Sequence, residues 1–196
     1  MVASTADPEN LGSSPSGYHL ITVRPSPMHA INQIVLDAGY PSTVIDYFSH
    51  WNKQVLRDLI IEDSGDHTAV LLFSFTLNNK PHNKNAIKDF IHDLRKRKGN
   101  VYSIGGGIRP YEPKINNDYN FLDVIYAGRS INLFARDIST GKLFSRFDQI
   151  NKPSVIVPET TEYDLPLVPR FHNDSFWGCK DIGSFEVSMG CRFDCS

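Results

Sequence analysis

The side chains best suited to chemistry gather near the end of the chain. Cys179, Cys191 and Cys195 are its three cysteines, and His172 precedes them. Zinc prefers three or four thiolate and imidazole ligands in a tetrahedral arrangement, and these residues supply that set. Structural zinc sites usually draw their ligands from close pairs, whereas the one close pair here is Cys191 and Cys195. Three interpretations stay open: a zinc site, a disulfide or redox pair with one thiol left over, and cysteines without a special role.

Cys179 is also the candidate for a nucleophilic cysteine. Such a residue needs a histidine that takes its proton and a third group that orients this histidine. Every histidine precedes Cys179, which excludes the residue order of papain-like enzymes. A chymotrypsin-like order would use His67 or His92 as the base, but no glycine follows Cys179 as the oxyanion loop of that family requires. We therefore expect the cysteine-rich tail to be structural before catalytic.

The glycine run Gly105-Gly106-Gly107 follows an expected strand. At this place α/β proteins often bind phosphate through backbone N–H groups. A phosphate loop also needs a helix that begins at the loop, yet the sequence from Ile108 to Pro113 indicates loop or strand, and no Walker lysine is present. The preferred interpretation is a turn or close backbone packing.

Arg95, Lys96, Arg97 and Lys98 form the one basic cluster and could contact phosphates. They fall in the last turn of an expected helix, where cations complement the negative end of the helix dipole. A solvated helix end is therefore the preferred interpretation, and nucleic-acid binding is the alternative.

The composition is that of an ordinary globular protein. Its 196 residues are 40% hydrophobic and carry a net charge of −2, which argues against a large surface for nucleic acid or anionic membrane. Residues 1–17 predict a disordered leader without a signal peptide, and residues 18–196 a single globular domain. No apolar run approaches the ~18 residues of a membrane span. We expect a soluble, cytoplasmic protein, or one in a host cytoplasm if it is exported without a recognisable signal.

Apolar periodicity predicts the elements of the first half. An almost continuous apolar run indicates a central strand, and the strand, helix and strand order around it predicts a right-handed parallel crossover. The expected elements are a strand over 18–24, a helical hairpin over 27–38 and 42–62, a strand over 68–77, a helix over 84–98 and a strand over 101–104.

The second half suggests short strands. Residues 121–127, 130–137 and 142–150 are separated by turns short enough for an antiparallel meander, and 182–188 would add an edge strand. The expected fold is α+β, with a helical hairpin and a βαβ unit packed on a mixed sheet that ends in an antiparallel three-stranded meander.

A local resemblance lies in residues 37–48, Asp-Ala-Gly-Tyr-Pro-Ser-Thr-Val-Ile-Asp-Tyr-Phe. This segment resembles the helix-turn-helix of tetracycline-repressor-type regulators over about thirty residues. The resemblance implies that Ser42, Thr43 and Tyr47 contact DNA. Packing of Phe48 in the core is the preferred alternative.

A second resemblance begins at Arg24. Followed by Pro25-Ser26-Pro27, it is similar to the arginine-led opening of ADP-ribosylating toxins. The resemblance implies that Arg24 binds dinucleotide phosphates and that Glu159 or Glu162 stabilises the ribosyl cation. An acidic surface loop is the preferred explanation of the two glutamates.

No complete catalytic or cofactor motif is present, so catalysis is not the preferred interpretation. We predict a non-catalytic binding or regulatory protein that engages another protein through its leader and loops, where Tyr111 and Trp177 suit an interface. The alternatives are a small enzyme of the ADP-ribosyltransferase type and a nucleic-acid binder that uses the helices over 42–62 and 84–98. No cofactor is expected apart from the zinc considered above.

Overall fold

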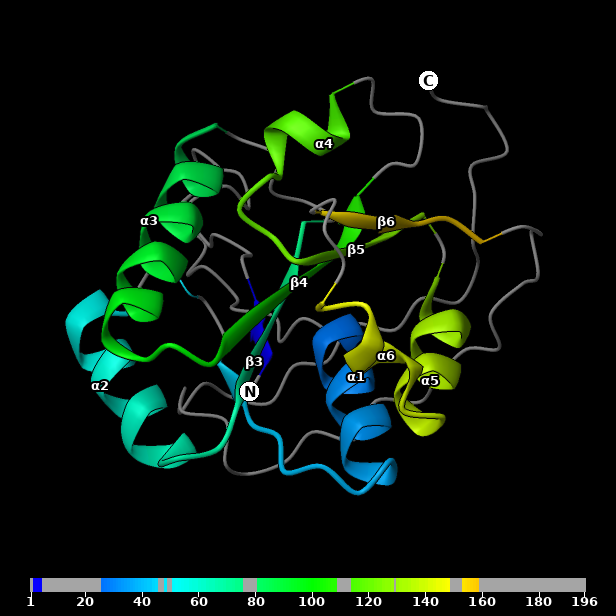
Figure 1. Ribbon diagram of the computed structural model, residues 1–196, viewed down its shortest axis with the longest axis horizontal. Coiled ribbons are helices and arrows are strands. Elements are labelled where there is room, and N and C mark those ends of the chain that lie inside the picture. Colours follow the sequence, from blue (N-terminus) through cyan, green and yellow to red (C-terminus); the bar gives the residue numbers. More distant parts are fainter. Residues whose placement is uncertain are drawn as a thin grey trace, which may run out of the picture.

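The protein is built on a parallel sheet with helices on both faces (Figure 1). The computed structural model describes residues 2–4, 26–45, 48, 51–75, 81–108, 114–128, 130–148 and 153–158. Six strands pair in the order β2-β1-β3-β4-β5-β6, and all of these pairs are parallel. The strands are β1 (Val2–Ser4), β2 (Val44–Ile45), β3 (Ala69–Ser74), β4 (Val101–Ile108), β5 (Val124–Ala127) and β6 (Ser154–Ile156).

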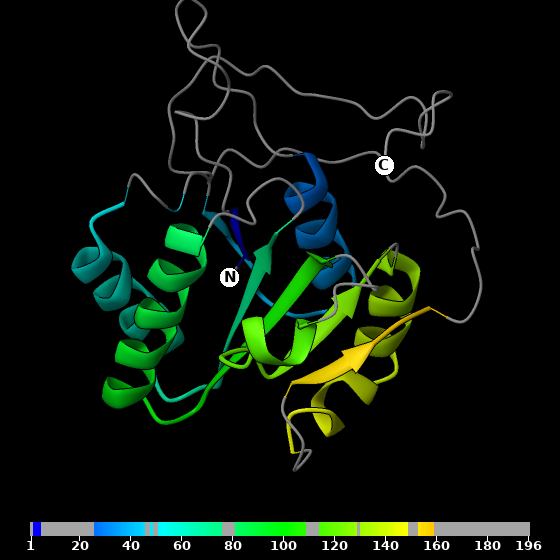
Figure 2. The ribbon, with the colours of Figure 1, turned by 90° about the horizontal axis from the view of Figure 1, so that it is seen from above.

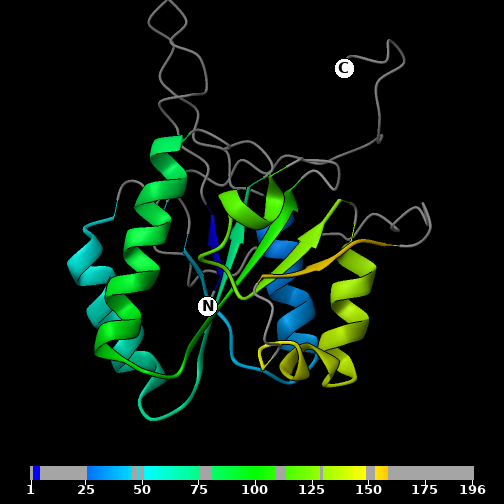
Figure 3. The ribbon, with the colours of Figure 1, turned by 45° about the horizontal axis from the view of Figure 1, so that its top comes forward.

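Helices connect successive strands and cover the two faces. They are α1 (Ser26–Asp37), α2 (Lys53–Ser64), α3 (Pro81–Arg97), α4 (Ile115–Asp118), α5 (Ile131–Ser139) and α6 (Lys142–Ser145). Figures 2 and 3 show α2 and α3 on one side of the sheet and α1 and α5 on the other. Because parallel strands run in one direction, each connection between successive strands returns the chain from the carboxyl edge of the sheet to its amino edge.

Two buried clusters follow from this layering. Strand residues alternate between the faces, so Leu71 and Phe73 join the cluster under α2 and α3, while Leu72 joins the cluster under α1 and α5. In the first cluster, the Phe48 ring packs edge-on against Phe73 and Phe90, with ring centroids 6.0 and 5.1 Å away. Two apolar layers on a fully parallel sheet explain why β3 is an almost unbroken apolar run.

The expected α+β fold with an antiparallel meander is wrong. Of its three expected strands, only 121–127 contains one, β5, which pairs in parallel with β4 and β6. Residues 130–137 lie mostly in α5 and 142–145 form α6. The error has a physical cause, because a short apolar run can satisfy either periodicity. The buried residues of α5 are Phe134, Asp137 and Ile138, which is a helical i, i+3, i+4 spacing.

The expected helical hairpin is also wrong. Strand β2 separates α1 from α2, and the two helices lie in different clusters on opposite faces of the sheet. Residues 44–45, where the resemblance to a helix-turn-helix requires a helix, are therefore a strand. By contrast, the expected strand, helix and strand order over 68–104 is present as β3, α3 and β4 in parallel.

The position of the first strand was not predicted from the sequence. Residues 2–4, inside the expected leader, form β1 between β2 and β3. The strand expected over 18–24 and the one expected over 182–188 lie outside the described residues. Within the part of the chain that the structure describes, no helix is long and apolar enough to cross a membrane.

The last crossover differs from the earlier ones. From β2 to β3 and from β3 to β4 the chain moves along the sheet through helices on the α2 and α3 face. From β5 to β6 it moves in the same direction, but α5 and α6 pack on the opposite face. This connection therefore has the opposite hand to the usual right-handed crossover, and it brings α5 beside α1.

Candidate functional site

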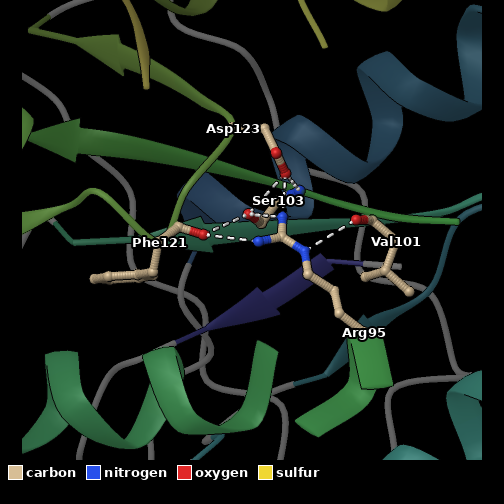
Figure 4. Close-up of polar contacts among 5 residues, drawn as sticks. All are labelled: Arg95, Val101, Ser103, Phe121 and Asp123. Atoms are coloured by element: carbon tan, nitrogen blue, oxygen red, sulfur yellow. Dashed lines mark hydrogen bonds and ion pairs between the residues drawn. The ribbon is translucent and has the colours of Figure 1, made fainter. Parts of the chain in front are cut away.

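A polar cluster joins α3, β4 and β5 at the amino edge of the sheet (Figure 4). The Arg95 guanidinium donates to the carbonyl oxygens of Val101 and Phe121, each at 3.2 Å, and to the Ser103 hydroxyl at 3.0 Å. It also pairs with the carboxylate of Asp123, which accepts the backbone N–H of Ser103 at 2.7 Å. The donors of Arg95 are thus used inside the protein.

The other three cations of the basic cluster also have partners in the chain. The Lys98 ammonium donates to the Gly65 carbonyl at 2.6 Å, and Arg97 pairs with Asp58 at 2.6 Å. Lys96 lies 3.9 Å from the Asp93 carboxylate. The Arg97–Asp58 pair joins α3 to α2, and the Lys98 bond joins the end of α3 to the turn that precedes β3. Phosphate binding by residues 95–98 stays a prediction, and an incoming phosphate would compete with these partners.

The opposite, carboxyl edge has a different character. One row of register partners crosses it from β1 to β6: Ser4, Ser74, Gly106, Tyr126 and Ile156. By strand alternation the members of this row from β3 to β6 face α1 and α5, as Leu72 and Ile104 do two residues earlier. In doubly wound sheets, ligands bind outside the carboxyl ends of the strands, where successive connections leave toward opposite faces. That switch point lies here between β1 and β3.

The glycine run in β4 has three different roles. A Cβ on Gly105 would lie 2.5 Å from Leu122 Cδ1, so this glycine allows close packing. Gly107 has a φ of 73° and occupies the point where the register between β4 and β5 shifts. A Cβ on Gly106 would meet nothing within 4 Å. Close packing, expected from the sequence, accounts for Gly105, while Gly106 opens onto unfilled space.

Helix α1 presents polar groups to the same layer. Its N-terminus lies at the carboxyl edge, because it follows β1 and leads back to the start of β2. Met28 and Val35 pack in the cluster under α1, and Asn32, which is 1% exposed, lies one turn from each. Among the described residues, neither the nitrogen nor the oxygen of the Asn32 amide has a hydrogen-bond partner. His29, fully buried, lies on the same helix.

A third polar group ties β5 to α5 and to the end of α6. The Tyr126 hydroxyl donates to Asp137 Oδ2 at 2.8 Å, and Arg146 donates to the same oxygen from Nη2 at 2.7 Å. Burial, together with the hydrogen bond to Asp137, raises the pKa of Tyr126 above its ordinary value. The phenol is thus a protonated donor at neutral pH and holds α5 on the sheet.

Other candidate residues from the sequence lie outside the described residues. They are His172, Cys179, Cys191 and Cys195 of the expected metal site, Tyr111 and Trp177 of the expected interface, and Arg24, Glu159 and Glu162 of the expected transferase site. Among the residues that are described, no group of three or more histidine, cysteine, aspartate or glutamate side chains could hold a metal ion.

Sequence reasoning identified the glycine run but not Asn32. Inside a helix an asparagine has no sequence signal that separates a buried position from an exposed one, apart from its spacing to Met28 and Val35. Comparison with models of known protein families gives no match, and neither does comparison with curated protein sequences.

Proposed function

We propose that this domain binds a small organic ligand at the carboxyl edge of its sheet, in the layer between α1 and the strands. The observation that carries the proposal is the open space over Gly106, in the row that crosses the carboxyl edge next to the β1/β3 switch point. A glycine without a packing partner at this position is where a ligand can approach the backbone closely.

The strand order supports the choice of ligand class by analogy. The order β2-β1-β3-β4-β5 is the flavodoxin-like order, and flavodoxin binds its FMN, a nucleotide-type cofactor, at the β1/β3 switch point. Fold analogy alone does not establish function. Two described polar side chains on this face of the sheet, the Ser74 hydroxyl and the Asn32 amide, are neutral and suit the hydrogen-bonding edge of a heterocycle. We therefore propose a nucleotide-containing cofactor.

The test uses the full chain and four cofactors that contain a nucleotide: FMN, NAD, coenzyme A and adenosylcobalamin. Each is titrated alone by calorimetry, and bound protein is followed by its melting temperature. Gly106→Leu fills the open space without a clash at Cβ, so we expect it to fold normally and to lose at least about 10-fold in affinity for the cofactor that binds.

Gly99→Leu is the matched control. A Cβ on Gly99 also meets nothing within 4 Å, but this residue lies between α3 and β4 at the amino edge. We expect Gly99→Leu to bind like the wild type. Binding of none of the four cofactors, or equal binding by Gly106→Leu and the wild type, would contradict the proposal.

A further inference from the structure

The buried amide of Asn32 lowers the stability of the fold. Its side chain is 1% exposed, and both its donor nitrogen and its acceptor oxygen have no hydrogen-bond partner. A buried polar group that has lost its water and gained no protein partner destabilises the fold, and most buried polar groups in proteins are satisfied. A leucine has the same number and branching of side-chain heavy atoms and would avoid this cost. The fold alone gives no reason for an amide at this position.

Asn32 lies among mainly apolar residues, with the fully buried His29 three residues before it on α1. Met28 and Val35, one turn away on either side, pack in the cluster that contains Leu72, Ile104 and Tyr126. The stripe of α1 that holds Asn32 therefore faces the sheet. Apart from His29, the described neighbours on that stripe offer apolar side chains to an amide that can donate two hydrogen bonds and accept two.

The same layer contains the open space over Gly106. Gly106 lies two residues beyond Ile104 on β4 and faces the same side of the sheet. Asn32 is the seventh of the twelve residues of α1, at the middle of the helix. The unpartnered amide and the open space at Gly106 thus lie on the same face of the sheet, the face that α1 and α5 cover.

We infer that the Asn32 side chain is a specificity-determining contact of the ligand that the proposed function assigns to this edge. The inference rests on that proposed function. The amide matches a group that presents a hydrogen-bond donor and an acceptor side by side, which is the chemistry of a nucleobase edge or a carboxamide. Binding of such a group satisfies both atoms of Asn32, and a ligand without it leaves them unsatisfied.

The first test needs no ligand. Because the amide costs stability in the free protein, Asn32→Leu raises the melting temperature of the ligand-free chain by about 3 to 6 °C. Gln33→Leu is the matched control, since the Gln33 amide donates to Asp37 at 2.7 Å on the exposed side of the same helix. We expect this control to leave the melting temperature unchanged or slightly lower. A fall for Asn32→Leu would overturn the inference.

The second test measures affinity by calorimetry with FMN, NAD, coenzyme A and adenosylcobalamin. Asn32→Leu and Asn32→Ala each weaken the cofactor that binds by about 10-fold or more, because the ligand edge then has no partner, whereas Gln33→Leu does not. If Gly106→Leu abolishes binding and both Asn32 variants bind like the wild type, the proposed function survives and this inference fails. If none of the four binds the wild type, both fail.

Discussion

The two edges of the sheet use polar side chains in opposite ways. At the amino edge, Arg95, Ser103 and Asp123 satisfy one another and the carbonyl oxygens of two neighbouring segments. At the carboxyl edge, the row contains a glycine that opens onto unfilled space, and the buried amide of Asn32 in the layer above it has no partner. Among the residues that the structure describes, the polar groups of the amino edge satisfy one another, whereas the Asn32 amide near the carboxyl edge has no partner.

This difference separates stability from function within one sheet. Buried polar groups that satisfy one another fix the register of strands, since breaking one bond leaves several groups unpaired. Groups without a partner lower stability, and proteins retain such local costs mainly at functional sites. The comparison predicts that changes at the amino edge affect folding, while changes at Gly106 and Asn32 affect binding.

The largest expected effect is at Asp123. In Asp123→Ala, the Arg95 guanidinium and the Ser103 N–H lose their shared acceptor in a mostly buried setting. The free energy of unfolding falls by about 3 kcal/mol, measured by urea denaturation. Asp118→Ala, which removes the more exposed partner of Lys84, costs less than about 1 kcal/mol. Equal effects of the two substitutions would mean that the amino-edge cluster adds no more than a surface ion pair.

Neighbouring glycines of β4 give the next test. Gly105→Ala forces a methyl group into Leu122 and lowers the free energy of unfolding by about 2 kcal/mol. In Gly106→Ala the methyl group enters open space, so stability changes by about 0.5 kcal/mol or less. Thermal and urea unfolding of both variants measure the contrast. A similar loss for both would show that Gly106 is packed, and the distinction between packing and binding glycines would fail.

The smallest effect is expected at Tyr126, which belongs to the carboxyl-edge row but bonds to Asp137. Tyr126→Phe removes this hydrogen bond and costs about 1 kcal/mol at pH 7. The raised pKa of Tyr126 means that the folded state keeps the phenol proton above pH ~10, where the unfolded state loses it. The stability of the wild type therefore falls as the pH rises through this range, by about 1.4 kcal/mol per pH unit from this group.

Tyr126→Phe lacks this dependence. The stability advantage of the wild type over the variant should disappear near pH ~11, as urea denaturation at several pH values would show. An advantage that stays constant from pH 7 to 11 would mean that the folded phenol titrates normally. Tyr126 would then lie in a more solvated setting than the paired network described here.

Much of the local structure was predictable. The apolar run over 68–77 and the i, i+3, i+4 pattern over 84–98 are strong signals, and they correspond to β3 and α3. Residues 130–137 were not predictable in the same way, because Ile131, Leu133 and Ala135 also alternate as a strand would. Burial of Phe134 and Ile138 under one helix face resolves that ambiguity, and burial is a tertiary property.

The sequence by itself determined the parallel β3-α3-β4 unit, the glycine run in its second strand and the cations at the end of its helix, because these depend on periodicity and on local backbone chemistry. Only the tertiary structure decided which edge each group occupies. It paired Arg95 with Asp123, 28 residues away, and it placed Asn32 in the same layer as Gly106. Strand order sets these neighbours, and strand order depends on packing between segments far apart in the chain.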